Sequence, residues 1–130
     1  MYTLNFKILN KSWHLRVLNP KPYDKKKKRK NSLGVTFSWK RRIDLHVEAI
    51  AFSEEAAKEL IVHELYHAYK GEMCVHSATE ITIDDVEEID AELMAKRGRE
   101  LLDLADTIYM AIAPNINTDG LIEGEKVEYI

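Results

Sequence analysis

Cysteine is almost absent from this 130-residue chain, and the single Cys74 cannot form an internal disulfide bond. We interpret Cys74 as a small thiol and not as a nucleophile, because no triad residues surround it. The chain also has no apolar run near the roughly 18 to 20 residues that a membrane-spanning helix needs, and its first residues alternate in polarity, unlike a signal peptide. We therefore expect a cytoplasmic protein without a membrane partner.

Hydrophobic residues make up 45% of the chain, which at this length predicts one domain spanning residues 1–130. The net charge of −3 conceals the run "KKKKRK" at Lys25–Lys30, whose removal takes away six positive charges and leaves −9. Prolines and polar residues surround the run, so residues 19–32 are predicted to form an exposed basic loop. The loop is a candidate contact for nucleic acid or a merely solvated segment, and it has no interleaved aromatic residues for base stacking.

Alternating apolar residues predict two β-hairpins. The first joins residues 2–9 to 13–17 through a turn at "NKS", and the second joins "LGVTFSW" to "RIDLHV". One helix is expected to begin after the cap residue Ser53 and to end at Gly71, and a long acidic helix is expected from Asp84. The tail, residues 114–130, can add an edge strand or stay irregular. The expected fold is α+β: a small, mostly antiparallel sheet of about four strands packed on two helices.

The first helix contains "LIVHELYHAYKG", which holds the pattern HExxH. His63 and His67 lie four residues apart on one helix face, so both imidazoles can aim at one Zn²⁺ about 2.0 to 2.1 Å from each nitrogen. Glu64 lies about 100° further round the helix and can reach a water at that metal without binding the metal itself, as a general base must. The pattern predicts a zinc-dependent hydrolase, and the alternative is a helix with two structural histidines.

A catalytic zinc ion needs a third protein ligand, which must come from elsewhere in the chain. The second helix contains "EEIDAE", where Glu88 and Glu92 share one face. One carboxylate can bind zinc while the other accepts the free ring N–H of a ligand histidine. We favour Glu88 as the ligand because zinc sites often use two histidines and one glutamate, and Glu87, Asp84 and His76 remain alternatives.

"HELYHA" followed by "EIDAE" resembles the gluzincin metallopeptidases, and the order of motifs over residues 33–95 is similar to the small ImmA/IrrE-like proteases common in phages and mobile elements. The resemblance implies that one Zn²⁺ is bound by His63, His67 and Glu88, with Glu64 as general base and Glu92 as the carboxylate behind a ligand histidine. It further implies that "RIDLHVEA" is an edge strand against which an intracellular protein substrate lies extended before its peptide bond is cleaved.

Two other functions are compatible with the motifs. A zinc-stabilised binding or regulatory module would use the same ligands without catalysis. A protease similar to the SprT-like family, which acts on DNA-bound proteins, also carries HExxH. Its third histidine is usually followed by glycine, however, whereas Ser77 follows His76 here.

Overall fold

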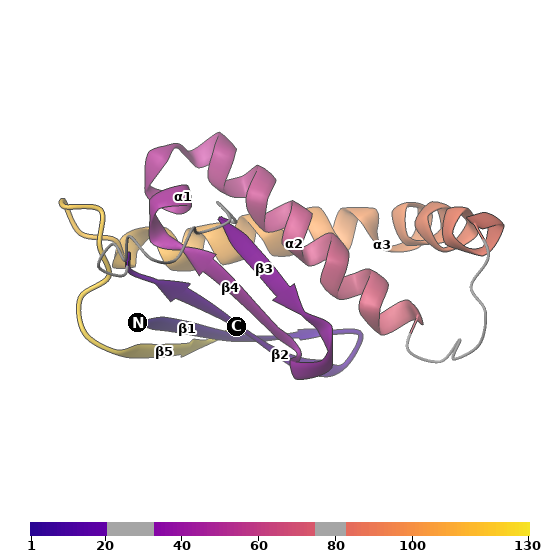
Figure 1. Cartoon of the computed structure of the whole chain (residues 1–130), viewed down its shortest axis with the longest axis horizontal. Helices are drawn as coiled ribbons and strands as arrows, with labels where there is room; N and C mark the ends of the chain where they lie inside the picture. The colour runs from indigo at the N-terminus through magenta and orange to yellow at the C-terminus, as the bar shows by residue number, and fades with distance from the viewer. Residues whose placement is uncertain (21–32, 75–82) are drawn as a thin grey trace, which may run out of the picture.

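Five strands form one sheet in the order β3-β4-β2-β1-β5, and two long helices pack against it (Figure 1). The computed structural model describes residues 1–20, 33–74 and 83–130, without the side chains of residues 74 and 83–86. The strands are β1 (Tyr2–Ile8), β2 (Lys11–Leu18), β3 (Gly34–Phe37), β4 (Arg42–His46) and β5 (Lys126–Tyr129). The helices are α1 (Val47–Phe52), α2 (Glu54–Cys74) and α3 (Ile83–Ile112), with short 3₁₀ helices η1 (Ser38–Lys40) and η2 (Ala113–Asn115). No helix in these described ranges is long and apolar enough to cross a membrane.

Both predicted hairpins are present. β1 pairs antiparallel with β2, and β3 pairs antiparallel with β4. The first turn was expected at "NKS", but it lies earlier, at Leu9 and Asn10, which both have positive φ angles of 49° and 65°. Asparagine tolerates this left-handed conformation better than most residues do, which favours a tight turn at this point.

The predicted α+β fold, with two helices packed on one small sheet, is confirmed. The prediction that this sheet is mostly antiparallel, with about four strands, is wrong. β2 pairs parallel with β4, and β5 pairs parallel with β1, so the sheet is mixed and has five strands. The parallel pairs join segments far apart in the chain, and local alternation of polarity carries no information about such neighbours. β5 comes from the tail, which therefore forms an edge strand.

One hydrophobic cluster joins the sheet to the helices. Alternate residues of β1 and β2 point into it, as period-two alternation requires. The cluster includes Tyr2, Leu4, Phe6, Ile8, Trp13, Leu15 and Val17 of these strands, Ile61, Leu65 and Tyr69 of α2, and Leu93, Leu101 and Ile108 of α3. Because α2 packs on both the sheet and α3, this packing positions the backbone of the residues on its remaining face.

The start of α2 agrees with the prediction, but its end does not. Ser53 Oγ accepts a 3.1 Å hydrogen bond from the Ala56 N–H and caps the helix. α2 runs past Gly71 to Cys74. The glycine has a different role there: a Cβ atom on Gly71 would lie 2.7 Å from Ser38 Oγ, so its absence lets η1 approach the helix closely.

Candidate metal centre

His63 and His67 lie on successive turns of α2 with both rings exposed. Their Nε2 atoms are 3.2 Å apart. Two nitrogen ligands bound to zinc at about 2.0 to 2.1 Å with tetrahedral angles are about 3.3 Å apart, so the pair fits two ligand positions of one zinc ion. The same distance suits a hydrogen bond from one ring N–H to the other ring nitrogen when no metal is bound.

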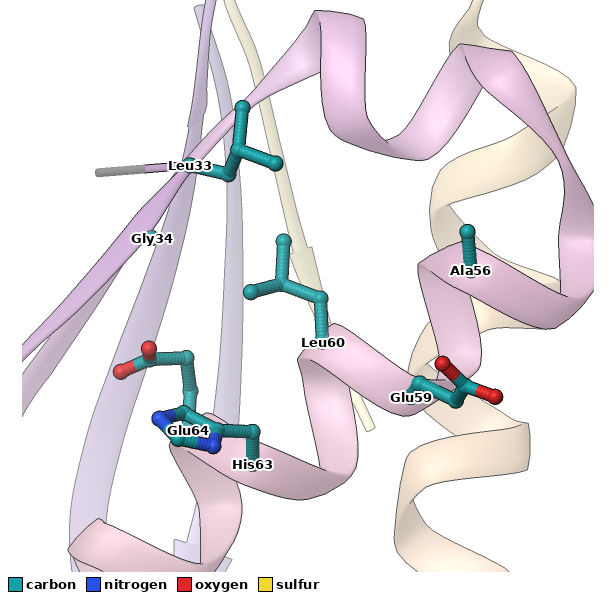
Figure 2. A pocket seen from close by; sticks show the side chains of 7 residues that line it. All are labelled: Leu33, Gly34, Ala56, Glu59, Leu60, His63 and Glu64. Carbon is teal, nitrogen blue, oxygen red and sulfur yellow. The ribbon is translucent and has the colours of Figure 1, made fainter. Parts of the chain in front are cut away.

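Glu64 is held between the helix and the sheet edge. Its side chain is only 5% exposed, and its carboxylate points toward β3 near Gly34 (Figure 2). Thr36 Oγ1 lies 2.5 Å from Glu64 Oε2 and 3.1 Å from the Glu64 carbonyl oxygen. The hydroxyl has one proton, and the charged oxygen is the stronger acceptor, so Thr36 orients the carboxylate.

Two adjoining pockets lie between β3 and α2 and share Gly34, His63 and Glu64; Figure 2 shows the one beside Leu33 and Leu60. One has a volume of about 420 Å³ and is partly apolar, with Leu33 and Leu60 at its walls. The other has a volume of about 360 Å³ and continues past Thr36 to His67. The candidate metal ligands and base therefore line one open depression beside a strand.

The strand beside this depression is β3, not the segment expected to form the edge. "RIDLHVEA" was expected to be the edge strand, but β4 lies between β3 and β2 and ends at His46, and Val47 begins α1. The side chains of Ile43 and Leu45 are fully buried, as suits an inner strand. Among the described residues, β3 pairs only with β4, so β3 is the edge.

The structure does not bring Glu88 or Glu92 to the histidines. Asp90 is the α3 carboxylate that contacts α2: it accepts a hydrogen bond from the Tyr66 hydroxyl, and Lys70 Nζ lies 3.2 Å away. Glu88 and Glu92 each lie two residues from Asp90, about 200° round the helix, and both are exposed. They therefore face away from His63 and His67 in this arrangement.

Neighbouring groups lower the pKa of two of these α3 carboxylates. The Tyr66 hydroxyl, together with Lys70, holds the pKa of Asp90 below its usual value. Glu92 forms a 2.5 Å ion pair with Lys96, which lowers the pKa of Glu92. In this arrangement both side chains therefore pair with lysines, and the contact of Glu92 with a ligand histidine stays a prediction.

Two of the three predicted metal ligands, His63 and His67, therefore lie together, and the predicted third does not join them. No group of three or more His, Cys, Asp or Glu side chains that could hold a metal occurs within the part of the chain that the structure describes. Glu87 is exposed at the start of α3. The side chains of Asp84 and Cys74 lie outside what the structure describes, as do the whole of His76 and the run Lys25–Lys30. Glu88 as third ligand remains a prediction.

Sequence reasoning missed three residues that matter at the site. Gly34 and Thr36 are spaced i, i+2 in "GVT", so both face α2, and this spacing was the available signal. Asp90 was not predicted, because the spacing of four residues that suggests a ligand pair joins Glu88 to Glu92 and passes over it. Its separation of three residues from the buried Leu93 indicates the inward face of α3.

No known protein family, curated protein or solved structure matches the chain. The function is therefore inferred from the residues of the site.

Proposed function

We propose that this protein is a zinc-dependent endopeptidase of the gluzincin type, in which His63 and His67 bind one Zn²⁺ and Glu64 is the general base. The 3.2 Å separation of the two Nε2 atoms carries the proposal, because tetrahedral zinc requires nearly this distance. The order of residues in "HELYH" adds to it, since a glutamate directly after the first histidine is suitably placed for a base.

The chain's own groups have distinct roles in this reaction. Bound zinc supplies a more acidic water and polarises the substrate carbonyl. Glu64 accepts the proton of the attacking water and delivers it to the leaving amine nitrogen. Thr36 keeps the carboxylate of Glu64 in one orientation. Burial of Glu64 against the strand limits its contact with bulk water.

The proposed substrate is a polypeptide segment bound in extended form along β3. Leu33 accepts a hydrogen bond from the His46 N–H, so it turns its carbonyl toward β4. Successive residues of an antiparallel strand direct their backbone groups to opposite sides, and Thr36, three residues on, therefore directs its N–H and C=O away from β4. A substrate strand can pair at this edge. The pocket between Leu33 and Leu60 then receives an apolar side chain.

Metal analysis tests the ligands. Protein purified without added zinc is expected to contain about one zinc per chain, and His63→Ala and His67→Ala are each expected to lose it, because a site with one histidine removed binds far more weakly. His46→Ala, on β4, is the control and retains zinc. A wild-type zinc content well below one, or full zinc content in both α2 variants, would contradict the metal site.

The same analysis identifies the third ligand. Glu88→Ala, Glu87→Ala, Asp84→Ala and His76→Ala are compared, and the one that loses zinc names the ligand. If Glu88 is that residue, the first turns of α3 must rotate or shift, since Glu88 faces away from α2 here.

A substitution of Glu64 tests the general base. Glu64→Gln is expected to retain zinc and to lose cleavage, and an active Glu64→Gln protein would contradict the general-base role.

A zinc-stabilised module without catalysis is the second candidate, favoured by the presence of only two ligands together in the described residues. Both candidates bind zinc, but only the peptidase cleaves. Digestion of a peptide library by wild-type protein and by Glu64→Gln separates them: cleavage by the wild type alone supports the peptidase, and no cleavage by either, with zinc bound, supports the module. The SprT-like alternative stays a prediction, because His76 and Lys25–Lys30 lie outside the described residues.

A further inference from the structure

Positive and negative charges are divided along the chain. Residues 1–53 carry 13 basic and 3 acidic side chains, whereas residues 54–130 carry 6 basic and 19 acidic side chains. β1 to β4 come from the first part, and α2 and α3 come from the second. Seven of the 13 basic side chains and one of the three acidic ones belong to residues 21–32, outside the described residues. The described part of residues 1–53 keeps 6 basic and 2 acidic side chains, so it is still net basic beside acidic helices. Such asymmetry favours a polyanionic partner on the sheet side.

The sheet has a second face, opposite the hydrophobic cluster. Tyr2, Leu4, Phe6 and Ile8 of β1 point into the cluster, so Thr3, Asn5 and Lys7 point to the other side. We call this second surface the open face, because the helices described here contribute to the cluster on the first.

Strand register places five residues in one row across the open face. The paired residues are Phe37 with Arg42, Arg42 with His14, His14 with Asn5, and Asn5 with Tyr129. Neighbouring strands are about 4.8 Å apart, so the row spans about 19 Å. It presents two aromatic rings with polar and basic groups between them.

Aromatic and basic side chains gather at the β3 end of this row, where Phe37 and Arg42 are partly buried and Trp39 and Lys40 are exposed. The Arg42 guanidinium lies 4.8 Å from the centroid of the Phe37 ring. Trp39 packs edge-on against Phe37 with a centroid distance of 5.4 Å, and 77% of its surface is exposed. Lys40 Nζ lies within 5.9 Å of both ring centroids. Tyr129 closes the other end with 79% of its surface exposed.

Charges on the open face are only partly neutralised. Asp44 Oδ1 and Oδ2 accept hydrogen bonds of 2.8 and 2.7 Å from Arg16, and Arg42 Nε lies 3.2 Å from the same carboxylate. One carboxylate thus serves two guanidinium groups. Burial, followed by the charges of Arg42 and Arg16, lowers the pKa of His14, in keeping with a positive potential across the row.

We propose that the open face binds a single strand of nucleic acid, with bases stacked on Trp39, on the Phe37–Arg42 pair and on Tyr129. Exposed aromatic rings flanked by cations are the arrangement that single-strand binders use, because every base offers a π-face and every linkage a phosphate. Paired bases do not offer their faces to rings on a sheet, so a duplex lacks this contact. The site is separate from the histidines, and its occupancy does not depend on peptidase activity.

Fluorescence anisotropy with labelled oligo(dT) and oligo(U) tests the proposal on the full chain. Trp39→Ala and Tyr129→Ala are each expected to raise Kd about fivefold or more, whereas Trp39→Phe, which keeps a ring, changes Kd less than about twofold. Phe52→Ala is the matched control. Phe52 is 86% exposed on α1, and this substitution removes an aromatic ring that lies outside the row. Both alanine variants change exposed side chains, and circular dichroism verifies their folding.

Intrinsic fluorescence gives an independent readout. The chain has two tryptophans, and Trp13 is 1% exposed, so quenching by a bound strand arises from Trp39 and is lost in Trp39→Phe. Equal affinity of wild type, Trp39→Ala and Tyr129→Ala would overturn the proposal. Equal affinity for duplex and single-stranded nucleic acid would also overturn it. A third contrary result would be that binding is lost when Lys25–Lys30 is replaced by serine and in no other variant. Those results would assign binding to charge alone.

Discussion

Thr36, in the edge strand β3, donates a 2.5 Å hydrogen bond to Glu64, in the helix that carries both histidines. This contact ties the orientation of the proposed general base to the strand on which the proposed substrate lies. A displacement of β3 would therefore move the carboxylate relative to His63 and His67. The contact makes the sheet edge part of the site.

Replacing Thr36 by valine removes the hydroxyl and keeps nearly the same shape. Hydrogen bonds to charged groups contribute about 1.5 to 3 kcal/mol, so kcat/KM for peptide cleavage is expected to fall about ten- to a hundredfold in Thr36→Val. Zinc content is expected to stay unchanged, because Thr36 is not a ligand. Thr36→Ser restores a hydroxyl and most of the activity. Full activity in the valine variant would show that the hydroxyl does not orient the base.

Gly34 leaves space that the site needs. A Cβ atom there would lie 2.9 Å from Leu45 Cδ2 and 3.3 Å from Glu64 Cγ, so Gly34→Ala must push against the core or the proposed base. We expect a loss of about 1 to 3 kcal/mol in the free energy of unfolding, measured with urea, and lower peptidase activity. Gly98→Ala in α3 is the opposite case, because its Cβ meets only Met94 at 3.4 Å and alanine favours the helix by up to about 1 kcal/mol. Equal stability of the two variants would contradict the close approach at Gly34.

How much of the site follows from sequence depends on the distance between its parts. His63, Glu64 and His67 are local on one helix, so their spacing alone predicts their arrangement. The direction in which Glu88 points depends on the rotation of α3 about its axis, which the burial of Leu93 and Leu101 determines. That rotation turns Asp90 toward α2. The spacing of two carboxylates four residues apart carries no information about this rotation.

The fold shows the same division. Alternating polarity correctly predicts both hairpins, because each joins neighbouring segments. The parallel contacts of β2 with β4 and of β1 with β5 depend on how separate segments assemble, so the strand order and the edge at β3 were not predictable from local pattern. The short helix α1 also escaped prediction, since six residues carry too little periodicity to distinguish a helix from the end of a strand.

Acid is expected to weaken the attachment of β5. Glu128 pairs with Lys126 and accepts a 2.6 Å hydrogen bond from the Tyr2 hydroxyl, and these contacts lower the pKa of Glu128. A carboxyl with a lowered pKa in the folded state stabilises the protein above the ordinary glutamate value of about 4.3, and this contribution is lost as the pH falls toward the lowered value. Glu128→Gln should therefore be less stable than wild type at pH 7 in urea unfolding, and the gap should narrow as the pH falls below the ordinary glutamate value. Glu125 is 78% exposed and forms only a longer ion pair, 3.4 Å from the N-terminal ammonium, so Glu125→Gln is the comparison and should show a smaller gap. A gap for Glu128→Gln that is independent of pH would contradict the ionic contribution.

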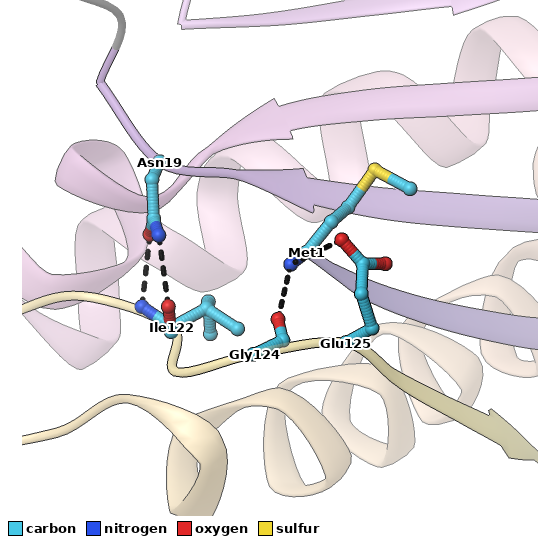
Figure 3. A network of polar contacts seen from close by, with 5 residues as sticks. All are labelled: Met1, Asn19, Ile122, Gly124 and Glu125. Carbon is cyan, nitrogen blue, oxygen red and sulfur yellow. Dashed lines mark hydrogen bonds and ion pairs between the residues drawn. The ribbon is translucent and has the colours of Figure 1, made fainter.

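Asn19 connects the end of β2 to the tail through one side chain (Figure 3). Its Nδ2 donates a 2.8 Å hydrogen bond to the Ile122 carbonyl, and its Oδ1 accepts a 2.8 Å hydrogen bond from the Ile122 N–H. Because Ile122 is buried, Asn19→Ala leaves both backbone groups without these partners, and we expect a loss of about 1 to 3 kcal/mol in the free energy of unfolding. Asn19→Asp keeps only the acceptor at neutral pH, and its stability should fall between those of the wild type and Asn19→Ala.

Hydrogen exchange locates the effect. The Ile122 amide should exchange faster in Asn19→Ala, while the amide of Gly120, which donates to the Asn117 carbonyl, should change much less. Uniform acceleration of both amides would show that Asn19 stabilises the whole domain instead of fastening the tail.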